Sequence, residues 1–199
     1  MSAFRYFIVY KPYLMLSQFT ADEGQISLSH LGYNFPPDVY PVGRLDADSE
    51  GLLILTNDKS LTGKLFDENH PHPRTYLVQV EGIFTEKAKQ QLEKGVTINL
   101  KGTRYLTKPA KVEILSEVPT LPPRIPPIRY RKNIPTSWIK ITLWEGKNRQ
   151  VRRMTAAVGF PTLRLVRIAI GKLQLGNMYP GEVKSVDAQK IKELILTHR

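Results

Sequence analysis

The chain has 199 residues, contains no cysteine, and carries 29 Lys and Arg against 18 Asp and Glu, which gives a formal net charge of +11. Without cysteine, a disulfide framework, thiolate metal sites and a cysteine nucleophile are all excluded. The longest apolar runs are much shorter than the ~20 residues of a membrane helix, and the N-terminal residues lack the pattern of a secretory signal, so we expect a cytoplasmic protein.

The spacing of apolar and turn residues predicts several strands and fewer helices. In chain order, the expected strands cover Tyr6–Lys11, Val39–Val42, Leu52–Thr56, Thr75–Glu81, Ala110–Leu115, Ser137–Leu143 and Leu163–Ile170. The expected helices cover Lys59–Phe66, Thr85–Lys94, Arg149–Val158 and Ala188–Leu196, with Gly95 and Gly159 as stops. Because helices and strands do not alternate strictly, we expect an α+β fold with a mixed, mostly antiparallel sheet flanked by helices.

A proline-rich segment interrupts this pattern. Residues 119–127 read PTLPPRIPP, with five prolines in nine residues, which no regular helix or central strand accommodates. We therefore expect one domain over residues 1–199, with sub-halves of about 1–118 and 136–199 and a Pro-rich insertion at 119–135. A cleft between the two halves would hold the functional site.

Positive charge is concentrated in one part of the chain. The stretch from Arg124 to Arg167 holds eleven basic residues and one acid, Glu145, and so carries +10 of the total charge. Clustered positive charge attracts polyanions and gives salt-dependent affinity. This concentration favours a nucleic-acid partner over a general solvated basic surface.

The expected helix Arg149–Val158 lies within this basic stretch. At about 100° per residue its three arginines share one face, opposite the apolar side chains. The arginine face is therefore available for a ligand while the apolar face packs. The arginines are Arg149, Arg152 and Arg153, and the apolar residues are Val151, Met154 and Val158.

Asp46, Asp48 and Glu50 form an acidic cluster in an expected loop between two strands. Loops held by strands often carry catalytic groups. A calcium loop is excluded because its twelfth position would be Asn57 instead of glutamate. A magnesium site for phosphodiester cleavage remains open, as does the simpler interpretation that some of these carboxylates only decorate a turn.

Histidines and glycine-rich loops give no sign of a cofactor. The four histidines show no zinc-binding spacing, His70 and His72 are expected in an exposed turn, and no nucleotide-binding glycine motif is present. We therefore expect neither a metal nor an organic cofactor. Tyr76 lies on an expected strand where it shares one face with Val78 and Val80, so a core role competes with a substrate-contacting role.

The segment GRLDADSEGLLILTND, residues 43–58, resembles the signature loop of pseudouridine synthases of the small-subunit-rRNA synthase A group. Further motifs match in order, so that the similarity extends from about Phe4 to Val186. The segment PPIRYRKNIPTSWIKITLWEG is most similar to members that act on large-subunit ribosomal RNA. The further motifs are Tyr10-Lys11-Pro12, RTYLVQVEG from Arg74, EGKNRQVRRMTAAVGFP from Glu145 and LRLVRIAIG from Leu163.

The resemblance implies an isomerase that converts a specific uridine of 23S (large-subunit) ribosomal RNA to pseudouridine without a cofactor. It implies that Asp46 is the catalytic carboxylate and that Arg152 is its arginine partner. Tyr76 would stack on the flipped base, and Leu165 would press on the other side of the base. The residues expected to bind substrate or RNA are Arg44, Leu165, Arg129, Arg131, Arg149 and Arg153.

Two departures from the family pattern matter. Many members carry an N-terminal S4 RNA-binding domain, whereas this chain starts with the catalytic region, so we expect the catalytic domain itself to capture RNA. Arg74 stands where lysine is common, and its different geometry leaves it outside the expected catalytic set. The expected partner is ribosomal RNA or a pre-ribosomal particle, with no membrane and no obligatory protein partner.

Two alternatives from other functional classes stay open. The first is a non-catalytic basic ribosome-associated RNA-binding protein, for which the Asp46 loop would have no chemical purpose. The second is a metal-dependent nuclease that uses Asp46, Asp48 and Glu50, for which added Mg²⁺ would be required and RNA chains would be cut.

Overall fold

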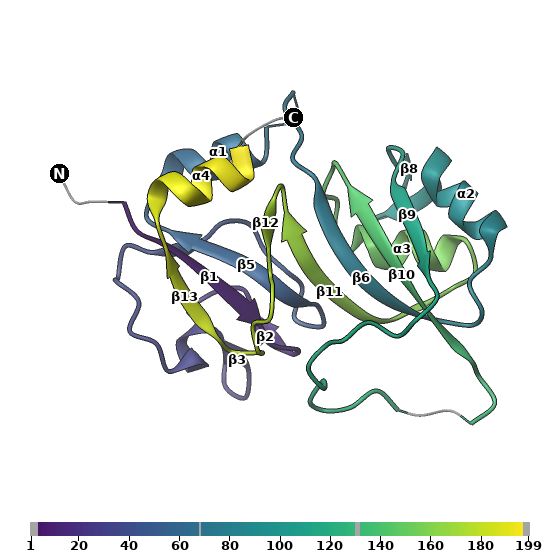
Figure 1. The fold of residues 1–199 in the computed structure, drawn as a ribbon, viewed down its shortest axis with the longest axis horizontal. Coiled ribbons are helices and arrows are strands. Elements are labelled where there is room, and N and C mark those ends of the chain that lie inside the picture. Colours follow the sequence, from purple (N-terminus) through teal and green to yellow (C-terminus); the bar gives the residue numbers. More distant parts are fainter. Residues whose placement is uncertain (1–3, 68, 130–131, 197–199) are drawn as a thin grey trace. The chain divides into compact units, whose positions relative to one another are not determined.

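The structure is a computed structural model that describes residues 4–67, 69–129 and 132–196 (Figure 1). The chain forms two compact units. The first unit contains Met1–His72 and Arg167–Arg199, and the second contains Pro73–Val166. Strand β11 (Thr162–Ile170) therefore carries the chain from the second unit back into the first.

The first unit is built around β1, which lies between β13 and β5 and pairs antiparallel with both. All residues of β1 and β5 are buried, which explains why their sequences are continuous apolar runs instead of alternating patterns. One sheet face packs Phe7, Val9, Leu53 and Leu55 with Leu28. The strands are β1 (Tyr6–Lys11), β2 (Met15–Leu16), β3 (Ile26–Ser27), β4 (Tyr40–Pro41), β5 (Glu50–Thr56), β12 (Leu173–Gln174) and β13 (Val183–Val186).

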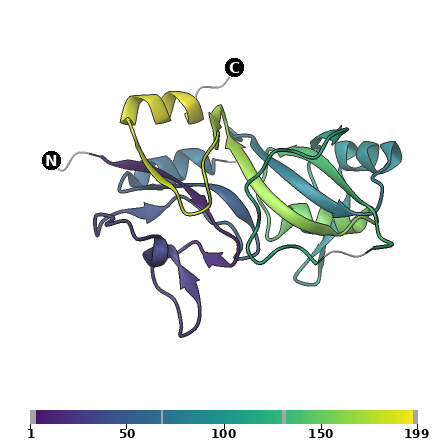
Figure 2. The ribbon, with the colours of Figure 1, turned by 60° about the horizontal axis from the view of Figure 1, so that its bottom comes forward.

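Two helices of this unit, α1 (Lys59–Leu65) and α4 (Ala188–Leu196), lie next to each other (Figures 1 and 2). Asp58 caps the start of α1 and is almost completely buried. Its carboxylate accepts a hydrogen bond from the Tyr6 hydroxyl at 2.5 Å and lies 3.2 Å from the Lys192 ammonium of α4. This contact ties β1, α1 and the C-terminal helix together.

In the second unit, β10 lies between β6 and β9 and pairs antiparallel with both. Helices α2 and α3 contribute Ala88, Leu92, Val151 and Met154 to the core that covers one face of this sheet. A short hairpin joins β7 and β8. The elements are β6 (Arg74–Glu81), α2 (Glu86–Lys94), β7 (Thr97–Leu100), β8 (Thr103–Leu106), β9 (Lys111–Leu115), β10 (Thr136–Leu143) and α3 (Gln150–Ala157).

The segment between β9 and β10 contains no helix or strand among its described residues, as its prolines predict. It is fastened to the second unit by backbone acceptors near its two ends. The Arg164 guanidinium donates to the carbonyl of Pro122 at 2.9 Å, and the backbone N–H of Gly82 donates to Pro135 at 2.7 Å.

The structure confirms the expected α+β class with a mostly antiparallel sheet, and it corrects several local expectations. Glu50 and Gly51 belong to β5 and not to the loop, so only the residues before them connect the two strands. The strand expected at 39–42 shrinks to Tyr40–Pro41. His72 is buried and not exposed, and its ring nitrogen lies 3.2 Å from the Lys64 carbonyl.

Candidate functional site

Asp46 lies in the loop that precedes β5, and the backbone on both sides of it is held in place. The Ser17 hydroxyl accepts from the N–H of Leu45 at 3.0 Å and donates to its carbonyl at 2.8 Å. On the other side, the N–H of Leu14 donates to the Ala47 carbonyl at 2.7 Å. A half-buried carboxylate thus projects from a backbone that has little freedom to move.

Lys11 lies beneath this loop at the end of β1 and is completely buried. Its ammonium donates to the carbonyls of Pro12 at 2.8 Å, Met15 at 2.7 Å and Ala47 at 3.3 Å. Three donated bonds match the three donors of an ammonium group. Lys11 therefore joins β1 to the residue that follows Asp46.

The acidic cluster around Lys11 offsets the effect of burial on its charge only in part. Burial lowers the pKa of Lys11 to about 7, and Glu50, Asp48 and Asp46 act in the opposite direction. Lys11 was not among the site residues predicted from the sequence. The available signal was a lysine that ends an otherwise apolar strand directly before a proline.

Gly51 allows the backbone of β11 to approach this site. It has a φ of +103°, and an added Cβ would be 2.8 Å from the backbone nitrogen of Arg167 and still closer to its carbonyl oxygen. Arg167 is itself buried, and its Nε donates to the Leu52 carbonyl at 2.8 Å. The close approach of the Arg167 backbone requires a residue without a side chain at position 51.

The second unit carries the other expected catalytic residues. Tyr76 lies on β6 opposite Ile141 of β10 and packs half-buried against the core of the unit. Leu165 belongs to the same core and is 6% exposed. Arg152 is half-buried on α3, with Nη1 donating to the Thr162 carbonyl at 3.4 Å. Their roles in the reaction remain a prediction.

A buried carboxylate fixes the turn before α3. Glu145 accepts from the Tyr105 hydroxyl at 2.5 Å, the Lys108 N–H at 2.7 Å and the Gln150 amide at 2.6 Å. Gln150 in turn accepts from the N–H of Lys147 at 2.9 Å. The network sets where α3 begins and so orients Arg152. Glu145 and Gln150 were not predicted as site residues, although both stand in the EGKNRQ motif.

The expected RNA-binding arginines differ in what they contact. Arg44, Arg129 and Arg149 are exposed, and Arg149 adopts a left-handed backbone with a φ of 49° just before α3. Arg153 instead donates to the Asn99 carbonyl at 2.6 Å and so ties α3 to β7. Arg131 lies outside the described residues.

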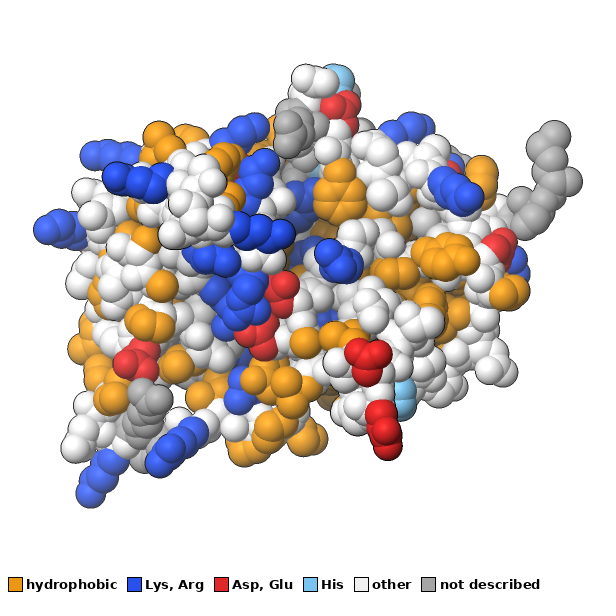
Figure 3. All heavy atoms as spheres, turned by 180° about the vertical axis from the view of Figure 1, so that it is seen from behind, with side chains coloured by type: hydrophobic (Ala, Val, Ile, Leu, Met, Phe, Trp, Pro, Cys, Tyr) orange, Lys and Arg blue, Asp and Glu red, His pale blue; other side chains and the backbone are white. Residues whose placement is uncertain are grey.

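Basic side chains are prominent on one face of the molecule (Figure 3). The structure also shows that part of the positive stretch is not on the surface. Arg164 and Arg167 are buried and donate to backbone carbonyls. The +10 stretch therefore contains structural arginines as well as exposed ones, a division that a charge count does not show.

No group of three or more His, Cys, Asp or Glu residues in the described part of the chain is arranged to hold a metal ion. The His70 ring lies 2.8 Å from the Asp67 carboxylate.

Among residues 4–67, 69–129 and 132–196, no helix is long and apolar enough to cross a membrane.

The model of the RNA pseudouridylate synthase family matches residues 5–157. The chain belongs to this family. The resemblance of its signature loop is thereby confirmed, and the chain is an RNA pseudouridine synthase, an isomerase that modifies RNA.

Relatives in several bacteria agree with this assignment. A Vibrio parahaemolyticus protein named Ribosomal large subunit pseudouridine synthase E is 50% identical over 176 residues, covering 88% of this chain and 71% of the relative. A Xanthomonas campestris protein of the same name is 48% identical over 182 residues, covering 92% and 95%. Ribosomal large subunit pseudouridine synthase B of Bacillus subtilis is 34% identical over 189 residues, covering 95% and 70%.

Two solved structures have a fold similar to that of this chain. A crystal structure of a pseudouridylate synthase superposes with a TM-score of 0.78 at 26% identity, covering 98% of this chain and 75% of that chain. The chain matched in a Cbf5-Nop10-Gar1 complex has a TM-score of 0.53 at 14% identity, covering 85% and 50%, and so shares the fold alone.

Proposed function

We propose that this chain isomerises a specific uridine of large-subunit (23S) ribosomal RNA to pseudouridine. The observation that carries the proposal is the 50% identity, over 88% of the chain, to a relative named for the large ribosomal subunit. Exposed arginines such as Arg44, Arg129 and Arg149 support an RNA substrate, because they supply phosphate contacts. The proposed substrate places the enzyme where ribosomal RNA is made and assembled.

Asp46 is the catalytic carboxylate in this proposal. The reaction breaks the bond from N1 of uracil to the ribose, turns the base, and joins C5 to the same ribose carbon. The proton lost from C5 is balanced by one gained at N1, so neither a redox partner nor an energy donor is needed. A carboxylate can serve as nucleophile or base in this sequence. The hydrogen bonds to the backbone of Leu45 and Ala47 support the proposal because they hold in place the backbone from which the carboxylate projects.

Tyr76, Arg152 and Leu165 complete the proposed reaction, on the basis of the motifs in which they stand. Tyr76 stacks on the base, and its hydroxyl takes part in removing the proton from C5. Arg152 acts on the carboxylate through the planar, two-bond geometry of a guanidinium. Leu165 provides apolar contact with the base. The target uridine must leave its stack, at a cost of a few kcal/mol that these contacts offset.

Carbodiimide mapping of pseudouridine in ribosomal RNA tests the proposed substrate. RNA is compared from cells that carry the gene, cells that lack it, and deleted cells that express either the natural chain or an Asp22→Asn control. Asp22 lies in an exposed loop outside the proposed catalytic residues. We expect one 23S position to lose its signal on deletion and to regain it with both chains. An unchanged 23S map after deletion would contradict the proposed substrate.

A further inference from the structure

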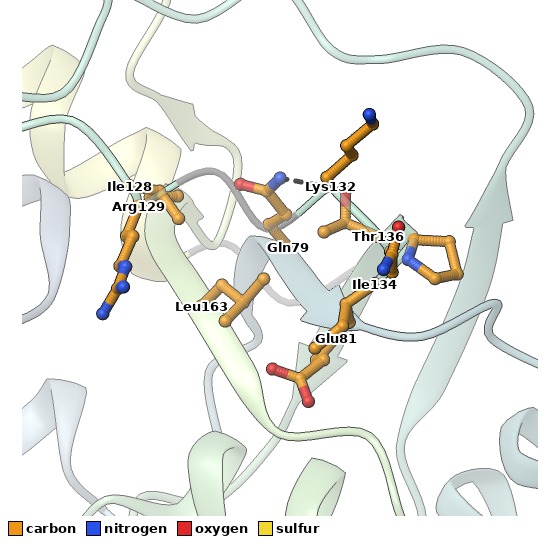
Figure 4. A pocket seen from close by; sticks show the side chains of 10 residues that line it. Gln79, Glu81, Ile128, Arg129, Lys132, Ile134, Thr136 and Leu163 are labelled. Atoms are coloured by element: carbon orange, nitrogen blue, oxygen red, sulfur yellow. Dashed lines mark hydrogen bonds between the residues drawn. The ribbon is translucent and has the colours of Figure 1, made fainter.

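A buried polar atom without a hydrogen-bond partner marks a place where a polar site is incomplete, because such atoms are rare in folded proteins. The cavity of about 460 Å³ in the second unit has no such atom among its described lining residues. Figure 4 shows its polar wall, where the Gln79 amide donates to the Thr136 hydroxyl at 3.2 Å. Glu81 in the same wall is also engaged in an interaction. The cavity therefore does not indicate an incomplete site.

The first unit does contain such an atom, the hydroxyl oxygen of Ser49. Ser49 directly precedes β5 and is 2% exposed. Its Oγ is buried and has no hydrogen-bond partner among residues 4–67, 69–129 and 132–196. In the same described part of the chain, each of the other buried serine and threonine hydroxyls donates or accepts a hydrogen bond. These residues are Ser17, Ser27, Thr56, Thr107 and Thr155.

A hydroxyl without a partner makes position 49 unfavourable in the free chain. A buried polar group that lacks a partner bears the full cost of leaving water. An alanine at this position would avoid that cost and would fill nearly the same space. The Ser49 hydroxyl therefore contributes favourably only in a state of the enzyme that supplies it with an acceptor.

Asp46 is the group best placed to become that acceptor. The backbone N–H of Ser49 donates to the Asp46 carbonyl at 3.0 Å, so the two residues are the first and last of one tight turn. The Cα atoms that close such a turn are less than ~7 Å apart. Rotation about the Ser49 Cα–Cβ bond moves the hydroxyl between its staggered positions without moving the backbone. A carboxylate accepts about four hydrogen bonds, so Asp46 can take this one in addition to its other contacts.

The other two carboxylates of the acidic cluster fit this role less well. Glu50 follows Ser49 at the start of β5, and successive side chains of a strand point to opposite faces. Glu50 is also buried, so it is not available to a substrate. Asp48 lies inside the turn and has no part in the proposed reaction. Asp46 is therefore the carboxylate for which an added donor would change the reaction.

We propose that Ser49 is a positioning residue for the isomerisation, whose hydroxyl donates a hydrogen bond to the Asp46 carboxylate in the complex with RNA. The inference rests on the proposed function and adds a residue to it. The Asp46 carboxylate is joined to its fixed backbone through a rotatable Cα–Cβ bond. A hydrogen bond from Ser49 holds it in one orientation toward the uridine, and fixed orientation of a reacting group lowers the barrier.

The charge of Asp46 provides a measurement that a purely structural serine would not affect. A hydroxyl donates more strongly to an ionised carboxylate than to a protonated one, so the bond favours the ionised, reactive form. Loss of the hydroxyl should therefore move the acid limb of the pH–rate profile to higher pH. The other charged groups of this site are the same in the natural chain and in a Ser49 variant. They are Lys11 of β1, Arg167 of β11, Asp48 and Glu50, together with Arg152 in the proposed function.

Ser49→Ala tests the proposal. Pseudouridine formation is followed in a single turnover, at saturating concentrations and across a range of pH, on a ribosomal RNA fragment that contains the mapped uridine. We expect the rate to fall by about ten- to hundredfold, as for the loss of a hydrogen bond to a charged group. The acid limb should shift upward by about half a pH unit or more. The midpoint of urea unfolding should stay unchanged or rise, because the free chain loses a hydroxyl that has no partner there.

Ser27→Ala is the matched control. Ser27 is also buried in the first unit, but its hydroxyl donates to the Phe19 carbonyl at 3.1 Å. It lies outside the proposed catalytic residues. We expect this variant to lower the urea midpoint and to keep the natural rate and pH profile, because it loses a hydrogen bond of the free chain. The two variants thus separate an effect on stability from an effect on the reaction.

The outcomes separate the two proposals. If the natural chain forms pseudouridine and Ser49→Ala stays within about threefold of its rate, the Ser49 inference is overturned and the proposed function stands. A slower Ser49→Ala with a lowered urea midpoint and an unmoved acid limb would also overturn it, because that result reports a structural role. If the natural chain forms no pseudouridine in any ribosomal RNA, both proposals fail.

Discussion

Replacing Gly51 with alanine tests how closely β5, the strand that follows the Asp46 loop, must approach the backbone of β11. Gly51 has a φ of +103°, and a Cβ there would be 2.8 Å from the Arg167 nitrogen. The left-handed backbone costs a non-glycine residue roughly 1–2 kcal/mol. Pushing the β11 backbone away adds about 1–3 kcal/mol of overpacking. We therefore expect Gly51→Ala to lower the free energy of unfolding by roughly 2–5 kcal/mol.

Two other glycines separate these contributions. Gly159 has a φ of +91° but nothing within 4 Å of an added Cβ, so Gly159→Ala should show the backbone cost alone, roughly 1–2 kcal/mol. Gly63 lies inside α1, also with nothing within 4 Å. Gly63→Ala should raise the free energy of unfolding by about 0.5–1 kcal/mol, because alanine has the better helix propensity.

The assay is urea unfolding followed by far-ultraviolet circular dichroism, with the free energy extrapolated linearly to water. The expected order of stability is Gly63→Ala, the natural chain, Gly159→Ala and then Gly51→Ala. A Gly51→Ala value within about 0.5 kcal/mol of Gly159→Ala would refute the reasoning, because the approach of the Arg167 backbone would then cost nothing beyond the left-handed φ.

Four further changes address the site and its support. Lys11→Met removes three hydrogen bonds to carbonyls and should lower the free energy of unfolding in urea by about 2–4 kcal/mol; no measurable change would contradict the anchoring role. Burial opposes ionisation of Asp58, but hydrogen bonds from Ser60, Tyr6 and Lys192 outweigh it and hold its pKa at about 2. This pKa lies below the ~3.9 of an unfolded aspartate, so the ionised carboxylate adds roughly 2–3 kcal/mol of stability above about pH 4, and that stability is lost as the pH falls through about 2. Asp58→Asn should not show this loss. If the free energy of unfolding falls with pH in the same way for Asp58→Asn and the natural chain, the role of Asp58 is contradicted. Tyr76→Phe should keep RNA affinity and slow single-turnover isomerisation by up to ~10²–10⁴-fold. Tyr76→Leu should in addition weaken RNA binding by ~1–3 kcal/mol. If Tyr76→Leu isomerises at the rate of the natural chain, Tyr76 is only a core residue. Arg152→Lys should slow single turnover by about tenfold or more at unchanged RNA affinity, and a natural rate would show that the guanidinium geometry is not needed.

Elements with strong local signals could be predicted from the sequence. Tyr6–Lys11 and Ala188–Leu196 have the expected bounds, because one is a continuous apolar run and the other a clear amphipathic helix. The hairpin β7–β8 was missed because its strands are short, and five of their eight residues are exposed. Strand β13 was missed for a similar reason, since VKSV becomes a strand only through its pairing with β1.

The candidate site was predictable only where a motif marks it. Asp46 stands out in its loop, but the reason for its fixed position does not, because Ser17 and Lys11 bond to backbone carbonyls far away in the sequence. Every residue has a backbone carbonyl, so the residue types in a sequence do not indicate which carbonyls accept these hydrogen bonds. For the same reason the count of positive charge between residues 124 and 167 included Arg164 and Arg167, although both are buried and donate hydrogen bonds to backbone carbonyls.

The central claim is that Asp46 performs the isomerisation. The most direct measurement is the yield of pseudouridine when the purified natural chain and Asp46→Asn are each incubated in excess over the mapped ribosomal RNA fragment. Asparagine has nearly the same shape as aspartate but serves as neither nucleophile nor base. The account predicts complete conversion by the natural chain and no detectable pseudouridine with Asp46→Asn, at equal RNA affinity. A rate for Asp46→Asn within about tenfold of the natural chain would contradict it.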